Sequence, residues 1–401
     1  MIAPRSRGKR ALAGGSLRPL AALCIALALS ACVAPSPGSD EEGMPETIRV
    51  GAPLDLSGIA AIAGIGTGEK RGMEVAAAEI NESGFLGDSK IELEFADTKA
   101  DKRDAAAAAI KLVQQDAVHA IVGFTLSPSF SAGAPAAARA ETPIVVPVFG
   151  TGLEAGDGYA YGIYPNLPKM YPPHDVEIAE SLGADTAAYL YDSDNPTATA
   201  ITDARRDALE AAGVDTVTVQ EVTSTTTDYR AQLTKIQQED PDILVVSVLP
   251  GQYPAIFLQR EELSIDVQVI ASDGVATRDS LEQAGDSMEC TVFTTAWSAL
   301  SDEGRNPTFI ESFQKAHPDL LPDSWAAAGY DALWFYAHAV KKAGTVEGTA
   351  VRDALAATSD FSGAFGNYGM NQDGQTTIEG TVLMIRDGAV ESWSADKSCK
   401  G

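Results

Sequence analysis

Short apolar runs rich in β-branched residues alternate with longer amphipathic stretches along the first part of the chain. The short runs predict strands, because a buried parallel strand reads as a continuous apolar segment. These runs lie at residues 48–53, 91–96, 120–123 and 143–147. The longer stretches repeat apolar residues at helical spacing and predict helices at 67–82, at 101–115 with Asp101 as N-cap, and after Ser127.

The same alternation starts again after the proline-rich stretch at residues 164–168. Strands are expected at residues 187–191, 216–219, 243–248 and 267–270, and helices at 198–212, 228–238 and 253–263. Beyond residue 291 the pattern is mixed. It contains a helix at 324–342 that is rich in aromatic residues, and a hairpin that turns at Asp387-Gly388.

This order predicts the α/β class, with two doubly wound parallel-sheet lobes joined by several hinge crossings. The first lobe is expected at residues 47–165 plus 296–366, and the second at 166–295 plus 367–398. Ligands of open α/β sheets bind beyond the carboxyl ends of the strands. Both lobes would therefore direct their binding loops into a cleft between them.

The first residues predict export and a lipid anchor. Basic residues up to Arg18 precede the apolar run 20–29, which is too short for a comfortable membrane span. Leu29-Ser30-Ala31-Cys32 looks like a bacterial lipobox, so residues 1–31 are predicted to be a signal peptide and Cys32 the lipidated residue. Residues 32–46 are rich in turn-forming residues and predict a flexible tether. The protein is therefore expected outside the cytoplasm, anchored to a bacterial membrane.

Charge and cysteine content narrow the function further. Without residues 1–31 the chain has 24 basic and 56 acidic residues, a net charge of −32. Such a surface repels phosphate backbones and argues against nucleic-acid binding. Export leaves Cys290 and Cys399 as the two remaining cysteines, and in an oxidising compartment they are predicted to form one disulfide.

The sequence contains no complete catalytic or metal-binding motif. The chain lacks G-x-S-x-G, and residues 64–70 (GIGTGEK) do not have the spacing of a phosphate loop. The four histidines are scattered without paired spacing. Residues 192–196 begin like a calcium loop, but Pro196 occupies a ligand position. We therefore expect a protein that is not an enzyme, with no metal and no cofactor.

Three loops that follow predicted strands carry candidate ligand-binding residues. Ser127 is expected to cap a helix whose first backbone N–H groups, with Ser129 nearby, favour a carboxylate. The loop after the next strand adds Phe149 and Thr151. In the second lobe, Asp273 ends a strand and offers a carboxylate to an ammonium group. Together these groups match an α-amino acid zwitterion, which would bridge the lobes and stabilise their closure.

Seven stretches in this order resemble the type I periplasmic binding proteins of the leucine/isoleucine/valine-binding family. The stretches are 48–58 (IRVGAPLDLSG), 71–84 (RGMEVAAAEINESG), 123–135, 143–151, 189–194, 272–274 (SDG) and 328–332 (AGYDA). The resemblance implies a substrate-capturing subunit of an ABC importer, working as a monomer with permease and ATPase subunits. It also implies that Ser127, Phe149 and Thr151 hold the ligand carboxylate and that Asp273 holds the ammonium.

The chain departs from the family where tyrosines often surround the ligand. The matching positions are Ala63, Pro196 and Gln252, and Tyr253 and Trp297 are candidates for replacement walls. The sequence therefore leaves three classes of ligand: a branched-chain or other amino acid, an amide or urea-like molecule, and a small carboxylate. A lipoprotein that senses such a ligand and signals to a membrane receptor is the alternative to transport.

Overall fold

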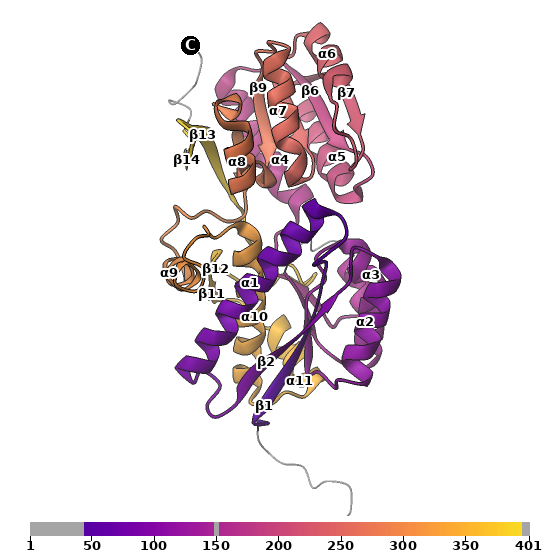
Figure 1. The fold of residues 1–401 in the computed structure, drawn as a ribbon, viewed down its shortest axis with the longest axis vertical. Helices are drawn as coiled ribbons and strands as arrows, with labels where there is room; N and C mark the ends of the chain where they lie inside the picture. Colours follow the sequence, from indigo (N-terminus) through magenta and orange to yellow (C-terminus); the bar gives the residue numbers. More distant parts are fainter. Residues whose placement is uncertain (1–43, 148–151, 395–401) are drawn as a thin grey trace, which may run out of the picture. The chain divides into compact units, whose positions relative to one another are not determined.

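The computed structural model describes residues 44–147 and 152–394, and these residues form the two-lobed α/β architecture that the sequence predicts (Figure 1). The first lobe is built on a five-stranded, fully parallel sheet. Its strand order is β2 (Lys90–Asp97), β1 (Thr47–Leu54), β3 (Ala120–Val122), β4 (Ile144–Val146) and β5 (Ala160–Gly162). Its first helices are α1 (Ala60–Ser83), α2 (Lys102–Gln114), α3 (Ser127–Arg139) and the short η1 (Leu153–Gly156).

The second lobe is built on a seven-stranded sheet that is parallel except at one edge. The order is β14 (Ala389–Ser392), β13 (Thr381–Arg386), β10 (Val292–Thr295), β9 (Gln268–Ser272), β8 (Ile243–Ser247), β6 (Thr186–Asp192) and β7 (Asp215–Val222). The hairpin of β13 and β14 supplies the antiparallel pairs. The helical segments are α4 (Leu167–Leu182), α5 (Pro196–Ala211), α6 (Arg230–Glu239), η2 (Pro250–Gln252), α7 (Tyr253–Glu262), η3 (Asp273–Ala276), α8 (Arg278–Ala284) and η4 (Gly285–Met288).

The chain returns to the first lobe after β10. The returning elements are α9 (Asn306–Ala316), α10 (Ser324–Ala343), α11 (Gly348–Ala356), β11 (Phe361–Gly363) and β12 (Gly366–Tyr368). Tyr368 packs in the core of the first lobe, and Gln375 bridges to Gly162 of β5. The chain therefore joins the second sheet at Thr381, later than the expected boundary at 367, because these contacts hold the intervening residues on the first lobe.

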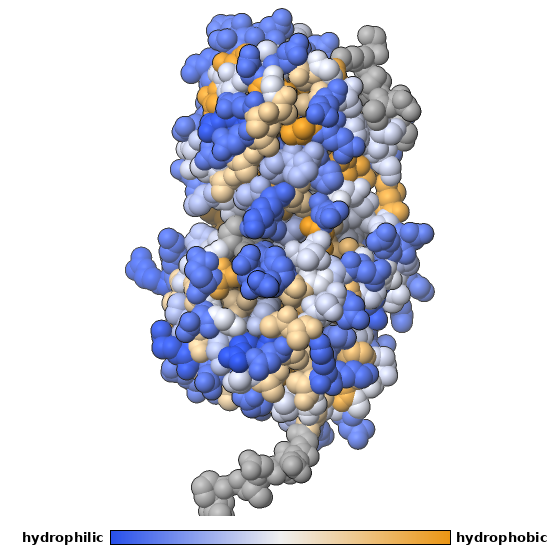
Figure 2. All heavy atoms as spheres, turned by 180° about the vertical axis from the view of Figure 1, so that it is seen from behind, coloured by the Kyte–Doolittle hydropathy of each residue, from blue (hydrophilic) through white to orange (hydrophobic). Residues whose placement is uncertain are grey.

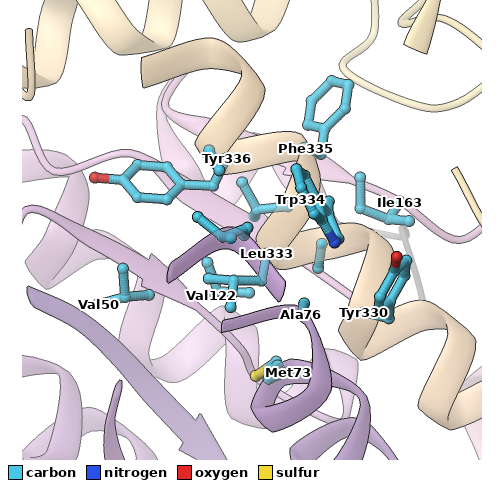
Figure 3. Packing of buried hydrophobic residues seen from close by; sticks show 14 of the residues in the cluster. Val50, Met73, Ala76, Val122, Ile163, Tyr330, Leu333, Trp334, Phe335 and Tyr336 are labelled. Carbon is cyan, nitrogen blue, oxygen red and sulfur yellow. The ribbon is translucent and has the colours of Figure 1, made fainter. Parts of the chain in front are cut away.

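Helix α10 supplies many of the residues of a hydrophobic core cluster in the first lobe (Figure 3). Its aromatic residues lie against α1 and the strands, among them Tyr330, Trp334, Phe335 and Tyr336, all buried. The two helix backbones touch, since a Cβ added at Gly72 would lie 1.8 Å from the carbonyl oxygen of Ala326. Apolar side chains around a nearly fully buried helix are the main source of stability in such a lobe.

Two helices begin elsewhere than the sequence pattern predicts, and one helix was not predicted. Helix α1 begins at Ala60 rather than 67, because Gly66 and Gly68 are helical and provide close packing instead of turns: a Cβ at Gly66 would lie 2.4 Å from the Asp55 carbonyl oxygen. Ser127 is the first residue of α3 and not its N-cap, because Leu126 is the last extended residue. Helix α4 was not predicted, since Pro172 and Pro173 lie inside it.

Hydrophilic residues cover most of the face shown in Figure 2, and apolar residues appear on it only in small patches. The large apolar side chains that are exposed in the described ranges are Ile59, Ile110, Leu258, Leu300 and Leu321. None of the helices in these ranges has the length and apolar character needed to cross a membrane.

Candidate functional site

A small cavity lies between the lobes at the carboxyl ends of β8 and β9. Its volume is about 40 Å³, space for at most a few water molecules. Ile65 of α1 and Trp325 of α10 line it from the first lobe. The remaining lining residues are Leu167, Tyr171, Asn195, Thr197, Ala198, Ile201, Ser247, Val248, Leu249, Pro250, Ser272, Asp273 and Gly274. The cavity is thus where fold topology places a ligand of two open α/β sheets.

Asp273 is the one charged side chain among the described residues that line this cavity. It follows β9 directly, so its carboxylate projects from the strand end. Tyr164 donates a hydrogen bond to Oδ2, and Tyr171 donates one of 3.2 Å to Oδ1. Burial raises the pKa of Asp273 to about 6, and the tyrosine hydroxyl groups oppose this rise. A buried carboxylate of this kind is suited to pairing with a cation.

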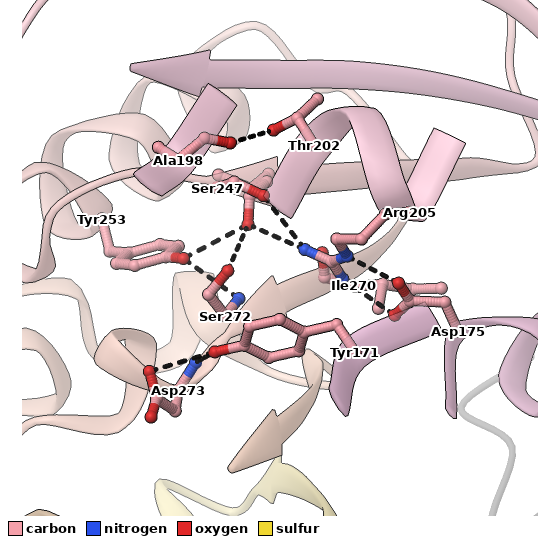
Figure 4. Close-up of polar contacts among 11 residues, drawn as sticks. Tyr171, Asp175, Ala198, Thr202, Arg205, Ser247, Tyr253, Ile270, Ser272 and Asp273 are labelled. Atoms are coloured by element: carbon pink, nitrogen blue, oxygen red, sulfur yellow. Dashed lines mark hydrogen bonds and ion pairs between the residues drawn. The ribbon is translucent and has the colours of Figure 1, made fainter. Parts of the chain in front are cut away.

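A hydrogen-bonded layer supports Asp273 from inside the second lobe (Figure 4). The backbone N–H of Ser272 donates to the hydroxyl of Tyr253 over 3.1 Å, and that hydroxyl donates to the carbonyl of Val246. Beneath them, Arg205 is fully buried and donates to Ser247 Oγ over 3.2 Å. These bonds tie the ends of β8 and β9 to helices α5 and α7, which limits movement of the strand end that carries Asp273.

The serines expected to bind the ligand carboxylate do not line the cavity. Ser129 is buried, and its hydroxyl lies 3.4 Å from both carboxylate oxygens of Asp55. Ser127 is partly buried at the start of α3. Phe149 and Thr151, the other expected carboxylate contacts, lie outside the described residues. Asp273 is therefore the one expected ligand contact that the described structure places on the cavity wall.

Gln252 and the two expected wall residues, Tyr253 and Trp297, have other partners in the structure. The side chain of Gln252 accepts the N–H of Leu249 and donates to Thr223 and Tyr229. Tyr253 is fully buried in the layer beneath Asp273. Trp297 donates from Nε1 to Asn306 over 2.7 Å and packs in the core of the first lobe. None of the three lines the cavity between the lobes.

No local sequence pattern indicated the aromatic residues that the structure gathers beside Asp273. Tyr164, Tyr171 and Trp325 belong to a small hydrophobic cluster that also contains Ile65 of α1 and Ile201 of α5. This cluster joins the two lobes next to the cavity. The proline-rich stretch at 164–168 marked the first crossing between lobes, but no local pattern indicates that its tyrosine reaches a residue more than 100 positions later.

Cys290 is disulfide-bonded. Cys399, its expected partner, and the expected lipidation residue Cys32 lie outside the described residues, so both assignments remain predictions. Within the described ranges, no group of three or more His, Cys, Asp or Glu residues gathers as a metal site.

Comparisons with known proteins agree with this architecture. A family model described as periplasmic binding protein matches residues 47–389. The leucine-, isoleucine-, valine-, threonine- and alanine-binding protein of Pseudomonas aeruginosa is 22% identical over 336 residues, which cover 82% of this chain and 87% of the relative.

Two solved structures show the same fold. The branched-chain amino acid transporter substrate binding protein LivJ from Streptococcus pneumoniae, in complex with isoleucine, is 26% identical with a TM-score of 0.77, covering 86% of this chain and 98% of that one. A solute binding protein of an ABC transporter from Rhodopseudomonas palustris, in complex with 3,4-dihydroxybenzoic acid, is 22% identical with a TM-score of 0.77, covering 86% and 95%.

Proposed function

The chain belongs to the periplasmic binding protein family, and from this premise we propose that it is the substrate-binding component of an ABC importer that captures an apolar amino acid between its lobes. The observation that carries the proposal is the carboxylate of Asp273 on the cavity wall, hydrogen-bonded to two tyrosines. A ligand ammonium paired with this carboxylate is charge-assisted and shielded from water. Periplasmic binding proteins are solute-binding proteins rather than enzymes, which agrees with a role in capture.

The other walls favour a neutral, apolar side chain on the ligand. Ile65 and Trp325 contribute apolar surface from the first lobe, and Ile201 contributes it from the second. The nearest buried cation, Arg205, is not on the wall and is held by Asp175. A charged group on the ligand side chain would have no described partner on this wall, and an unpaired buried charge is costly. Phe149 and Thr151, the expected partners of the α-carboxylate, lie outside the described residues. The Pseudomonas aeruginosa relative is named for leucine, isoleucine, valine, threonine and alanine, and the Streptococcus pneumoniae structure contains isoleucine, all of them amino acids with uncharged side chains.

Binding of L-isoleucine to the mature protein tests the proposal, with L-alanine, L-glutamate and L-lysine as comparisons. Isothermal titration calorimetry should detect isoleucine and alanine but neither charged amino acid. Asp273→Asn should weaken isoleucine binding by about 30-fold or more, since losing one partner of a buried charge pair costs 2–5 kcal/mol. Acetamide, urea and 3,4-dihydroxybenzoate complete the panel. Binding of one of these three, with no amino acid bound, would contradict the proposal.

We also propose that Cys32 carries the lipid anchor and that Cys290 pairs with Cys399. Mass spectrometry of the protein purified from membranes should find a diacylglyceryl-modified peptide that begins at Cys32. Cys32→Ser should release the protein from the membrane. Peptide mapping without reduction should recover the peptides of Cys290 and Cys399 as one cross-linked species, and two separate free thiols would contradict the pairing.

A further inference from the structure

Each carboxylate oxygen of Asp273 accepts a hydrogen bond from a different tyrosine. Tyr164 lies in the first crossing between the lobes, and Tyr171 lies in α4, the helix that follows this crossing. The hydroxyl of Tyr171 also accepts the backbone N–H of Asp273 over 3.3 Å. Tyr171 therefore contacts both the backbone and the side chain of Asp273, which fixes the direction in which the carboxylate projects.

The ring of Tyr171 packs against Arg205, a buried arginine of the second lobe. The guanidinium of Arg205 lies 5.2 Å from the centre of the Tyr171 ring, within the range of a cation–π contact. Arg205 is itself fixed by two hydrogen bonds to Asp175, and all three side chains are buried. The position of the Tyr171 hydroxyl is thus determined by contacts inside the lobe and does not depend on a ligand.

Tyr164 is held by the first lobe instead. Its ring stacks on Trp325, with centroids 5.7 Å apart and planes at 25°, and meets the edge of Phe365 at 5.6 Å. Its hydroxyl reaches Asp273 in the second lobe. Through this one side chain, the aromatic residues of the first lobe and the carboxylate of the second lobe are in contact.

We propose that Tyr164 and Tyr171 are positioning residues that hold the Asp273 carboxylate in place as the acceptor for the ligand ammonium. The inference rests on the proposed function, because it assigns the partners of the same carboxylate. A carboxylate offers about four acceptor positions. The two phenols and the backbone N–H of Gly274 use three of them, which leaves one for an ammonium group. The two tyrosines supply hydrogen bonds that favour the charged form of a carboxyl group in a site where burial disfavours it.

If Tyr164 and Tyr171 stabilise the charged form of Asp273, ligand binding should depend on pH in a way that each tyrosine affects. The titratable groups around Asp273 are Tyr164 of the crossing, Tyr171 of α4 and Tyr253 of α7, with the Arg205–Asp175 pair beyond Tyr171. Both the Tyr164 and Tyr171 hydrogen bonds lower the pKa of Asp273, whereas burial raises it to about 6. Protonation removes the acceptor, so isoleucine binding should fall as the pH falls through about 6. Loss of either hydroxyl should raise that midpoint.

The test measures L-isoleucine affinity from pH 5 to 8 for the wild type, Tyr164→Phe, Tyr171→Phe and Asp273→Asn. Tyr336→Phe is the matched control, because Tyr336 is fully buried in the first lobe and its hydroxyl has no hydrogen-bond partner among the described residues. Tyr164→Phe and Tyr171→Phe should each bind about tenfold more weakly at pH 7, as expected for losing a hydrogen bond to a charged group. Each should also lose binding at a higher pH than the wild type. The control should match the wild type throughout.

A second measurement does not require the ligand. The carbon-13 signal of the Asp273 carboxyl, assigned by its disappearance in Asp273→Asn, should titrate at a higher pH in Tyr171→Phe and in Tyr164→Phe. Unchanged titration in both would overturn the inference. If the wild type does not bind isoleucine, the proposed function fails while the titration still decides the role of the tyrosines. If Asp273→Asn abolishes binding and both tyrosine variants bind normally, only the inference about the tyrosines fails.

Discussion

Arg205 holds both carboxylate oxygens of Asp175, at 2.6 and 2.9 Å, with neither side chain exposed to solvent. The pair joins α5 to α4 directly beneath the layer that carries Asp273. Arg205 also donates to Ser247 at the end of β8. The candidate ligand site of the second lobe is therefore built on an ion pair that is fully buried from solvent.

Asp175→Asn should strongly destabilise the protein, because removing one partner leaves the Arg205 charge buried and unpaired. The expected loss is about 3–5 kcal/mol in the free energy of unfolding, measured by urea denaturation. Glu262→Gln is the control, since the Arg230–Glu262 pair of 2.7 Å is about half exposed. It should cost less than about 1 kcal/mol. Equal losses in the two variants would show that burial does not decide the strength of these pairs.

Gly72→Ala should disrupt the contact between α1 and α10. The added Cβ would lie 1.8 Å from the Ala326 carbonyl oxygen and 2.8 Å from the Tyr330 nitrogen, so the helices must separate. We expect a loss of about 2 kcal/mol or more in the free energy of unfolding. Gly64→Ala in the same helix meets nothing within 4 Å and should instead stabilise the protein by about 0.5–1 kcal/mol. A stabilised Gly72→Ala variant would contradict the close approach of these helices.

Glu69 should make stability fall with rising pH. The side chain is fully buried, Thr125 donates to its Oε2 over 2.6 Å, and its Oε1 has no hydrogen-bond partner among the described residues. Burial raises its pKa well above the usual value of 4.5, so the folded protein keeps a proton that the unfolded chain releases. Above pH 4.5, the wild type should therefore lose stability relative to Glu69→Gln, until the pH exceeds the raised pKa.

Urea unfolding from pH 2 to 9 measures this difference. Glu347→Gln provides a comparison of opposite sign, since backbone N–H groups lower the pKa of Glu347, which caps α11. The stability that Glu347 contributes should be present above pH 4.5 and should disappear as the pH falls through its lowered pKa. A constant difference between Glu69→Gln and the wild type at every pH would show that Glu69 does not titrate with an altered pKa.

Arg278→Ala should increase the rate at which isoleucine dissociates. Arg278 of α8, in the second lobe, donates over 2.8 Å to the Asp319 carbonyl oxygen in the loop before α10 of the first lobe. These two segments lead directly to the cavity residues Asp273 and Trp325. Loss of one hydrogen bond between the lobes should raise the dissociation rate about twofold to tenfold in stopped-flow measurements. Arg230→Ala, whose partners all lie in the second lobe, should leave the rate unchanged.

The strands and most helices were predictable because their signals are local. A buried parallel strand is a continuous apolar run, and an amphipathic helix repeats its apolar residues every three or four positions. Asp273 was predictable for the same reason, because an acidic residue directly after a strand can be recognised from the local sequence. Helix α4 was missed because its internal prolines oppose the local preference, and packing of its apolar residues in the second lobe overrides that preference.

The surroundings of Asp273 were decided by tertiary structure. Tyr164 and Tyr171 are separated from Asp273 by 109 and 102 residues, and chain crossings bring them together. The sequence suggested that Ser129 contacts a ligand, but in the fold its hydroxyl lies within hydrogen-bond distance of the Asp55 carboxylate. The sequence by itself therefore determined the two lobes and the place of one charged side chain at a strand end. Packing between elements that are distant in the chain decided which side chains face the cavity and which form contacts inside the lobes. A local sequence pattern does not encode that packing.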